Sequence, residues 1–261
     1  MNPGVNWLVG ALLFCVLVIF PAPGDGQRLP RRKLVWSEEF KRSGRPDSAK
    51  WDYEVGRVRN NEVQYYTRDR RENSRVEGGH LTIVARREEF EKATVTSASL
   101  TSKQSWTYGR IEVRAKIPTG RGVWPAIWTL GTNIKEIGWP KCGEIDIMES
   151  VGFDPERIHC TVHAGNDAGK DVSKGKSIVA DKPYNGFHVY AVDWDAKRIT
   201  LTYDGKTVNS YENDGANLWP FDKPQYLILN LAIGGAWGGQ KGVDDSIYPS
   251  KFLIDYVRVY Q

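Results

Sequence analysis

The stretch Arg110-Ile111-Glu112-Val113-Arg114-Ala115-Lys116-Ile117 alternates charged and apolar residues at every position. Because successive side chains of a strand point to opposite faces, this period of two predicts a strand with one buried and one solvated face. Similar alternating or β-branched runs recur along the chain. Seven further strands are expected at residues 81–85, 144–148, 158–163, 188–194, 199–203, 225–230 and 253–260.

Turn-forming residues separate these runs. The sequence places Gly78-Gly79, Pro118-Thr119-Gly120 and Gly234-Gly235 between expected strands, and Asp204-Gly205 predicts a tight hairpin. The sequence contains no amphipathic pattern longer than two helical turns, no internal repeat and no linker-like change of composition. Many short strands without alternating helices favour an all-β sandwich or jelly roll, formed by one domain over residues 27–261.

The composition supports a globular, ligand-binding protein. The chain has 261 residues, of which 40% are hydrophobic and 26% charged, which excludes a disordered chain. A net charge of +4 with two short basic runs, at 31–33 and 68–71, does not form a nucleic-acid footprint, so no nucleic-acid partner is expected. The 10 Trp and 12 Tyr exceed what a core of this size needs and indicate stacking on a flat ligand.

An apolar run occupies residues 7–20 and is followed by Pro21 and Pro23. A membrane span needs about 20 apolar residues, which makes a retained anchor the weaker alternative. The run predicts a signal peptide over residues 1–24, a mature protein that begins near residues 25–27, and a secreted, extracellular location without membrane attachment after cleavage.

Two cysteines, Cys142 and Cys160, remain after that segment is removed. If their segments form a hairpin that turns near residues 153–154, Glu149 faces His159 and the two cysteines are offset from each other. That register disfavours a disulfide, although a secreted location would permit one.

Three carboxylates lie within six positions in Glu144-Ile145-Asp146-Ile147-Met148-Glu149. Glu144 and Asp146 share a strand face about 6.6 Å apart, whereas Glu149 has the opposite parity. A β-bulge near Met148 would bring Glu149 to the same face. Carboxyls this close raise at least one pKa, and two carboxyls with separated pKa values are what retaining glycoside hydrolysis requires.

Other interpretations of these residues remain open at this level. The three acids also suit the solvated face of a half-buried strand or a calcium site, although calcium loops are usually rich in Asp, Asn and Gly. His159 and His163 would chelate a metal on a helix, but on a strand they stand about 13 Å apart. A histidine-based metal site is therefore not expected.

Several segments together resemble the laminarinases, the endo-β-1,3-glucanases of glycoside hydrolase family 16. They are Gly143–Glu149, the upstream run Gly-Arg-Gly-Val-Trp-Pro-Ala-Ile-Trp-Thr-Leu at 120–130, Ile-His-Cys-Thr-Val-His at 158–163 and Gly-Gly-Ala-Trp-Gly-Gly at 234–239. The resemblance extends from Leu34 to Tyr260. It implies a concanavalin-like β-sandwich jelly roll of two antiparallel sheets with a concave substrate cleft.

The resemblance also implies an activity. A secreted, monomeric enzyme of this kind cuts internal β-1,3 bonds of a β-glucan polysaccharide by a retaining double displacement and needs no cofactor for catalysis. Carried over by position, Glu144 is the nucleophile, Asp146 an auxiliary acid and Glu149 the general acid/base.

Substrate contacts are expected from the same resemblance at Asn60, Trp124, Trp128, Trp139, His163 and Trp237. Two further contacts are expected from position alone, namely Arg114, which follows Ile111-Glu112-Val113 in a predicted strand, and Asn230 at a strand end. Core packing is the alternative for each Trp, a surface salt bridge for Arg114, and a structural role for His163. Residues 56–59 read Gly-Arg-Val-Arg where laminarinases often carry a glycine-rich loop with a Trp, which predicts altered subsites at the non-reducing end.

A structural calcium ion on the convex side is implied as well. Its ligands would be the backbone carbonyls of Glu39 and Gly79 and the carboxylate of Asp255, unless Asp255 simply caps a hairpin. Two other function classes stay open. A non-catalytic β-glucan-recognition protein would have no use for Glu144 and Glu149, and a transglycosylase of the same fold would retain both.

Overall fold

The computed structural model describes residue 1 and residues 32–261 except 167, 214 and 216–218. Residues 32–261 form one compact unit. The predicted signal peptide and its cleavage region lie outside the described residues. Among the residues that the structure describes, no helix has the length and apolarity needed to cross a bilayer.

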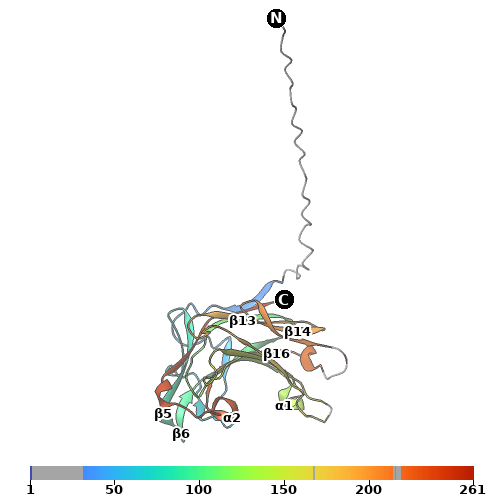
Figure 1. Cartoon of the computed structure of the whole chain (residues 1–261). Helices are drawn as coiled ribbons and strands as arrows, with labels where there is room; N and C mark the ends of the chain where they lie inside the picture. Colours follow the sequence, from blue (N-terminus) through green and yellow to red (C-terminus); the bar gives the residue numbers. More distant parts are fainter. Residues whose placement is uncertain (2–31, 167, 214, 216–218) are drawn as a thin grey trace. The chain divides into compact units, whose positions relative to one another are not determined.

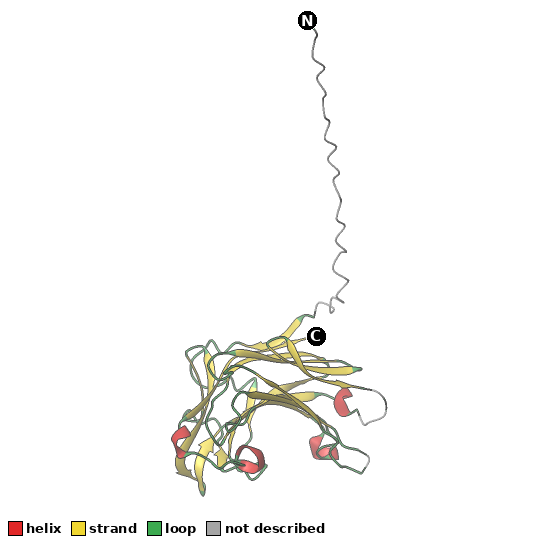
Figure 2. Cartoon of the chain, viewed as in Figure 1, coloured by secondary structure: helices red, strands yellow, loops and turns green. Residues whose placement is uncertain are grey.

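Two stacked, curved sheets form this unit, and strands account for most of its described regular structure (Figures 1 and 2). The outer sheet runs in the order β15 (Lys206–Glu212), β14 (Arg198–Tyr203), β13 (His188–Trp194), β8 (Gly109–Lys116), β17 (Ser250–Tyr260), β5 (His80–Phe90), β6 (Ala93–Ser97), β3 (Gln64–Tyr66), with β1 (Leu34–Glu38) on β17 and β4 (Ser74–Glu77) on β5. The inner sheet runs β12 (Lys174–Val179), β11 (Arg157–His163), β10 (Glu144–Glu149), β9 (Val123–Gly131), β16 (Gln225–Ile233), β7 (Ser99–Trp106), β2 (Trp51–Tyr53).

These sheets confirm the predicted all-β jelly roll. All strand pairs are antiparallel except β3 with β6, within the described part of the chain. Each of the eight predicted strands falls on an observed one, although Ile117 lies one residue beyond β8. The described helices are short, namely α1 (Ile134–Ile137), α2 (Gly235–Gly238) and the 3-10 turns Pro220–Asp222 and Asp245–Ile247.

The main core lies between the two sheets. On β8 the residues Ile111, Val113 and Ala115 are buried, while the intervening charged residues face outward, as the alternation predicts. The opposite wall of the core comes from the inner sheet, including Ile145 and Ile147. Because this burial uses one face of each sheet, the second face of the inner sheet is left free to carry a cleft.

The predicted hairpins form as expected. Asp204 and Gly205 connect β14 to β15 with φ angles of 46° and 75°, the positive values that a two-residue hairpin turn needs. Glu149 pairs with His159 across β10 and β11. Cys142 and Cys160 are both buried and unbridged, in agreement with the register argument.

Candidate active site

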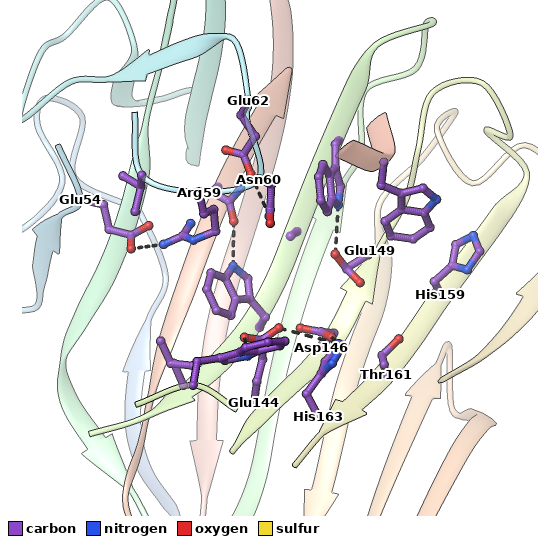
Figure 3. Close-up of a pocket in the computed structure, with 18 of the residues that line it drawn as sticks. Glu54, Arg59, Asn60, Glu62, Glu144, Asp146, Glu149, His159, Thr161 and His163 are labelled. Atoms are coloured by element: carbon purple, nitrogen blue, oxygen red, sulfur yellow. Dashed lines mark hydrogen bonds and ion pairs between the residues drawn. The ribbon is translucent and has the colours of Figure 1, made fainter. Parts of the chain in front are cut away.

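A cleft of about 810 Å³ lies on the concave face of the inner sheet (Figure 3). Strands β9, β10, β11 and β16 provide its floor, and residues 54–62, Trp139 and Trp237 provide its walls. The cleft contains all three predicted catalytic residues. It also contains seven of the eight predicted substrate contacts, namely Asn60, Trp124, Trp128, Trp139, His163, Asn230 and Trp237.

A β-bulge in β10 brings the three acids to one face, as predicted. Against β9, Asp146 pairs with Trp128 and Met148 pairs with Ile127, so that Ile147 has no partner. Ile147 and Met148 are both 0% exposed and point into the core one after the other. Two successive inward residues reverse the alternation, which places Glu149 in the cleft with Glu144 and Asp146.

Each outer acid of the three accepts a hydrogen bond from an indole. Trp139 Nε1 donates to Glu144 at 3.0 Å, and Trp124 Nε1 donates to Glu149 at 3.0 Å. These bonds fix the two carboxyls on either side of Asp146, which is itself buried.

Burial is the main influence on the pKa values of the three acids. It raises the pKa of Glu149 to about 7, against the opposing hydrogen bond from Trp124. Burial likewise raises the pKa values of Glu144 and Asp146, and the negative charge of an adjacent carboxyl raises them further. Three crowded, desolvated carboxyls therefore keep protons up to higher pH than exposed ones.

His163 provides the positive charge that faces these acids. Its Nε2 lies 3.1 Å from Asp146 Oδ2 and 3.9 Å from Glu144 Oε1. Burial lowers the pKa of the imidazole, but the close contact with Asp146 and the charges of the neighbouring carboxylates outweigh it and raise the pKa to about 10. The ring is therefore an imidazolium at neutral pH.

Glu144, Asp146 and His163 bring their side-chain oxygen and nitrogen atoms within 4.8 Å of one another. With Nε2 of His163 3.1 Å from Asp146 Oδ2, the three groups form a compact network of opposite charges.

Aromatic side chains form the walls of the cleft. Trp139 is 49% exposed, and Trp124 packs edge-on against Trp237 with ring centroids 5.4 Å apart. Trp128 is only 6% exposed and donates from Nε1 to Asn230 Oδ1 at 2.8 Å, so it serves the core and the cleft floor together. Indole faces along a groove are suited to binding the apolar faces of sugar rings.

Sequence reasoning missed a charged group at one end of the cleft. The Arg59 guanidinium lies over the Trp128 ring, 4.8 Å from its centroid, and pairs with Glu54. The buried Glu62 accepts hydrogen bonds from Gln64 at 2.6 Å and Asn60 at 3.2 Å. The departure at residues 56–59 pointed to this end, but nothing in the sequence showed that Arg59 would cover an indole.

Two residues of β11 were also missed. His159 and Thr161 line the cleft beside His163. They share its strand face, since residues two apart point the same way. Their spacing of two and four residues from His163 was the sequence signal that could have placed them in the cleft. The His159 ring packs edge-on against Trp237 at 4.8 Å, and burial lowers its pKa, so the imidazole is neutral at neutral pH.

The prediction that Arg114 lines the cleft is wrong. Arg114 belongs to β8 in the outer sheet, where it pairs with Asp255 and lies over the Phe187 ring. Its parity explains this position, because it shares a strand face with Arg110 and Glu112, opposite to the buried residues. The alternative of a surface salt bridge is the correct one.

The side-chain ligand of the predicted calcium site is already engaged by a cation. The Asp255 carboxylate is paired with Arg114. Calcium needs several oxygen ligands free of competing cations. The calcium site at Glu39, Gly79 and Asp255 thus rests on the family resemblance alone.

Thermal unfolding with calcium and with a chelator tests this site. Because Asp255 is already ion-paired, we expect the same Tm in both conditions. An ion present at 100 times its Kd would stabilise the fold by about 2.7 kcal/mol, which is a rise of roughly 5–10 °C for a domain of this size. A shift of that order would contradict the expectation.

A concave β-sandwich with paired carboxyls between aromatic walls defines a class of enzymes that cleave polysaccharides. Comparison with known proteins makes the class specific. The model of glycosyl hydrolases family 16 matches residues 61–258. The chain belongs to this family and is a glycoside hydrolase.

Individual relatives cover nearly the whole chain. A β-glucanase of Rhodothermus marinus is 45% identical over 98% of this chain and 93% of its own length. A glucan endo-1,3-β-glucosidase of Cryptopygus antarcticus is 34% identical over 96% of this chain and 98% of its own length. The crystal structure of the Rhodothermus marinus laminarinase has a TM-score of 0.84 and 47% identity, and covers 90% of this chain and 99% of that one.

Proposed function

We propose that this chain is an endo-β-1,3-glucanase that hydrolyses internal bonds of laminarin-type glucans with retention of configuration. The observation that carries the proposal is the bulge in β10, which presents Glu144 and Glu149 to one cleft, each held by an indole hydrogen bond. The names of the relatives, a β-glucanase and a glucan endo-1,3-β-glucosidase, support the substrate class.

The first chemical step uses both outer acids. Glu149, whose pKa is raised to about 7, holds the proton that the leaving glycosidic oxygen receives. Glu144, as a carboxylate, attacks the anomeric carbon and forms a glycosyl-enzyme ester. The Glu149 carboxylate then removes a proton from water, which attacks the same carbon and restores the β configuration.

The second task of the site is to keep Glu144 ionised beside another carboxyl. Two adjacent buried carboxyls cannot both carry charge easily, so the pair retains one proton. When that proton is on Asp146, Glu144 is free to attack. The imidazolium of His163, within 3.9 Å of both acids, stabilises the remaining charge.

Proton NMR of the purified protein with a soluble β-1,3-glucan tests the proposal. We expect cleavage of internal bonds and β-configured reducing ends in the first products. First products of α configuration would overturn the retaining mechanism. Binding without cleavage would favour a recognition protein, and lengthened oligosaccharides in place of hydrolysis products would favour a transglycosylase.

A bell-shaped pH dependence of kcat/KM is expected. Activity should rise with pH as the Glu144–Asp146 pair loses its first proton, and should fall above about pH 7 as Glu149 loses the proton that it must donate. The optimum therefore lies on the acid side of neutrality. Initial rates on soluble glucan across the pH range measure it, and a maximum well above pH 7 would contradict the assignment of Glu149.

The remaining properties are proposals as well. We infer that the mature chain begins near residues 25–27 and acts outside the cell as a monomer. Amino-terminal sequencing of protein recovered from culture medium tests the first point. Size-exclusion chromatography with light scattering tests the second.

A further inference from the structure

The imidazole of His163 lies between carboxylates on both sides. Its Nε2 faces Asp146 at 3.1 Å, and its Nδ1 lies 2.9 Å from Oδ2 of Asp171. Both ring nitrogens thus have a carboxylate partner, which suits an imidazolium that donates in two directions. The mechanism above uses the first contact and leaves the second unexplained.

Asp171 is placed by the loop that follows β11. Val172 N donates to Ala164 O at 2.9 Å, and Asp171 forms a β-bridge with Gly165, so the loop returns alongside the end of β11. This return brings the Asp171 carboxylate to the edge of the ring that faces away from β10. Asp171 is not among the described residues that line the cleft, and its contact toward the cleft is the one with His163.

Other described groups also lie around His163. Glu144 and Asp146 face it from β10, and the Trp139 ring lies at 5.8 Å. Lys141 lies against Gly165 of the same loop. The second oxygen of Asp171, Oδ1, is buried without a hydrogen-bond partner. The other oxygen, Oδ2, has the His163 ring as its partner, in a contact of opposite charges.

We propose that Asp171 is a positioning residue, which holds His163 with Nδ1–H toward itself and Nε2–H toward Asp146, and keeps the ring positively charged. The inference rests on the proposed function, because its consequence concerns the nucleophile. A positively charged His163 favours the ionised form of Glu144. Without the charge-assisted hydrogen bond to Asp171, the imidazolium is held less firmly against Asp146 and Glu144, and Glu144 then ionises at a higher pH.

Asp171→Asn separates charge from geometry, since an asparagine oxygen still accepts a hydrogen bond from Nδ1–H. We expect the acid limb of kcat/KM to move to higher pH and kcat at the optimum to fall on the order of 10-fold, the size of effect seen for carboxylates that orient metal-binding histidines. KM should change little, because Asp171 does not touch the substrate. Asp171→Glu, which restores the charge, should recover most of the activity.

A readout independent of activity comes from NMR of the protein labelled with ¹⁵N-histidine, with the His163 signal assigned by His163→Gln. The pKa of His163 should be lower in Asp171→Asn than in the wild type. Asp181→Asn, on the exposed surface, is the matched control and should change neither the pKa nor the pH profile.

Further results would separate a failure of this inference from a failure of the proposed function. In a His163→Gln background, Asp171→Asn should cost nothing more, because both act through one ring. An unchanged His163 pKa and an unchanged acid limb in Asp171→Asn would overturn the inference while wild-type cleavage left the proposed function standing. Absence of cleavage by the wild type would overturn the proposed function, and the NMR titration would still decide the role of Asp171.

Discussion

Glu144→Gln is expected to lower kcat on a β-1,3-glucan by a factor on the order of 10⁴–10⁶, the range seen when a catalytic nucleophile is removed. Glutamine keeps the shape of the side chain and still accepts the hydrogen bond from Trp139, but its amide oxygen cannot form the glycosyl ester. The substitution also removes a carboxyl from a crowded, desolvated cluster. The folded protein should therefore be as stable as the wild type or more so.

Steady-state kinetics with thermal unfolding measures this effect. Glu156→Gln, at an exposed site, is the matched control and should leave kcat unchanged. A sharper test is Glu144→Ala with azide, because a small anion in the space of the lost carboxylate attacks the anomeric carbon once. The product should be an α-glycosyl azide. Near-wild-type turnover by Glu144→Gln would refute its role as the nucleophile.

Glu149→Gln is expected to lower kcat on the polysaccharide by about 10²–10⁴-fold, the usual contribution of general acid–base catalysis. The loss should depend on the leaving group. An aryl β-glycoside whose phenolate needs no proton should form the glycosyl-enzyme at a nearly normal rate, whereas a sugar leaving group should not. The alkaline limb of the pH profile should disappear with that substrate, because the group that titrates near pH 7 is gone.

Burst kinetics on the aryl substrate separates the two steps. Glu149→Gln should release about one equivalent of phenol quickly and then turn over slowly, since water lacks its general base. Azide should accelerate the slow phase and yield a β-glycosyl azide, the opposite anomer to the one from Glu144→Ala. Equal losses on both classes of substrate would show that Glu149 is not the acid/base residue.

Much of the fold could be predicted from the sequence, because several strands show a clear alternation of apolar and polar residues. Residues 110–117 show the period of two that the structure confirms. Strand β7, rich in Ser and Thr, and β12, an exposed edge with two lysines, have no such pattern and depend on pairing with neighbours. Pairing of this kind is a tertiary property, which local sequence does not encode.

The candidate site likewise has residues that could be predicted from the sequence and residues that could not. The acids of β10 could be predicted because strand parity and one bulge decide which way they point. Arg114 could have been placed from its parity, because it alternates with the buried Val113 and Ala115 and so points away from the core of its own sheet. Arg59 over Trp128 could not be predicted, since it joins a loop to a strand distant in sequence. Asp171 behind His163 could not be predicted because it depends on how the loop after β11 returns alongside that strand.

The unpaired Ile147 in β10 makes chain length, and not only chemistry, a determinant of activity. Substitutions along this strand can adjust acidity or packing one side chain at a time. The spacing of the acids and the bulge are matched, because a strand of the same length without the bulge would turn Glu149 into the hydrophobic interior. Deletion of one residue between Asp146 and Glu149 would instead place the three acids two positions apart, so that a regular strand would present all of them to the cleft. In this family, the spacing of the motif therefore has to be compared together with the bulge before an acid is assigned to the cleft.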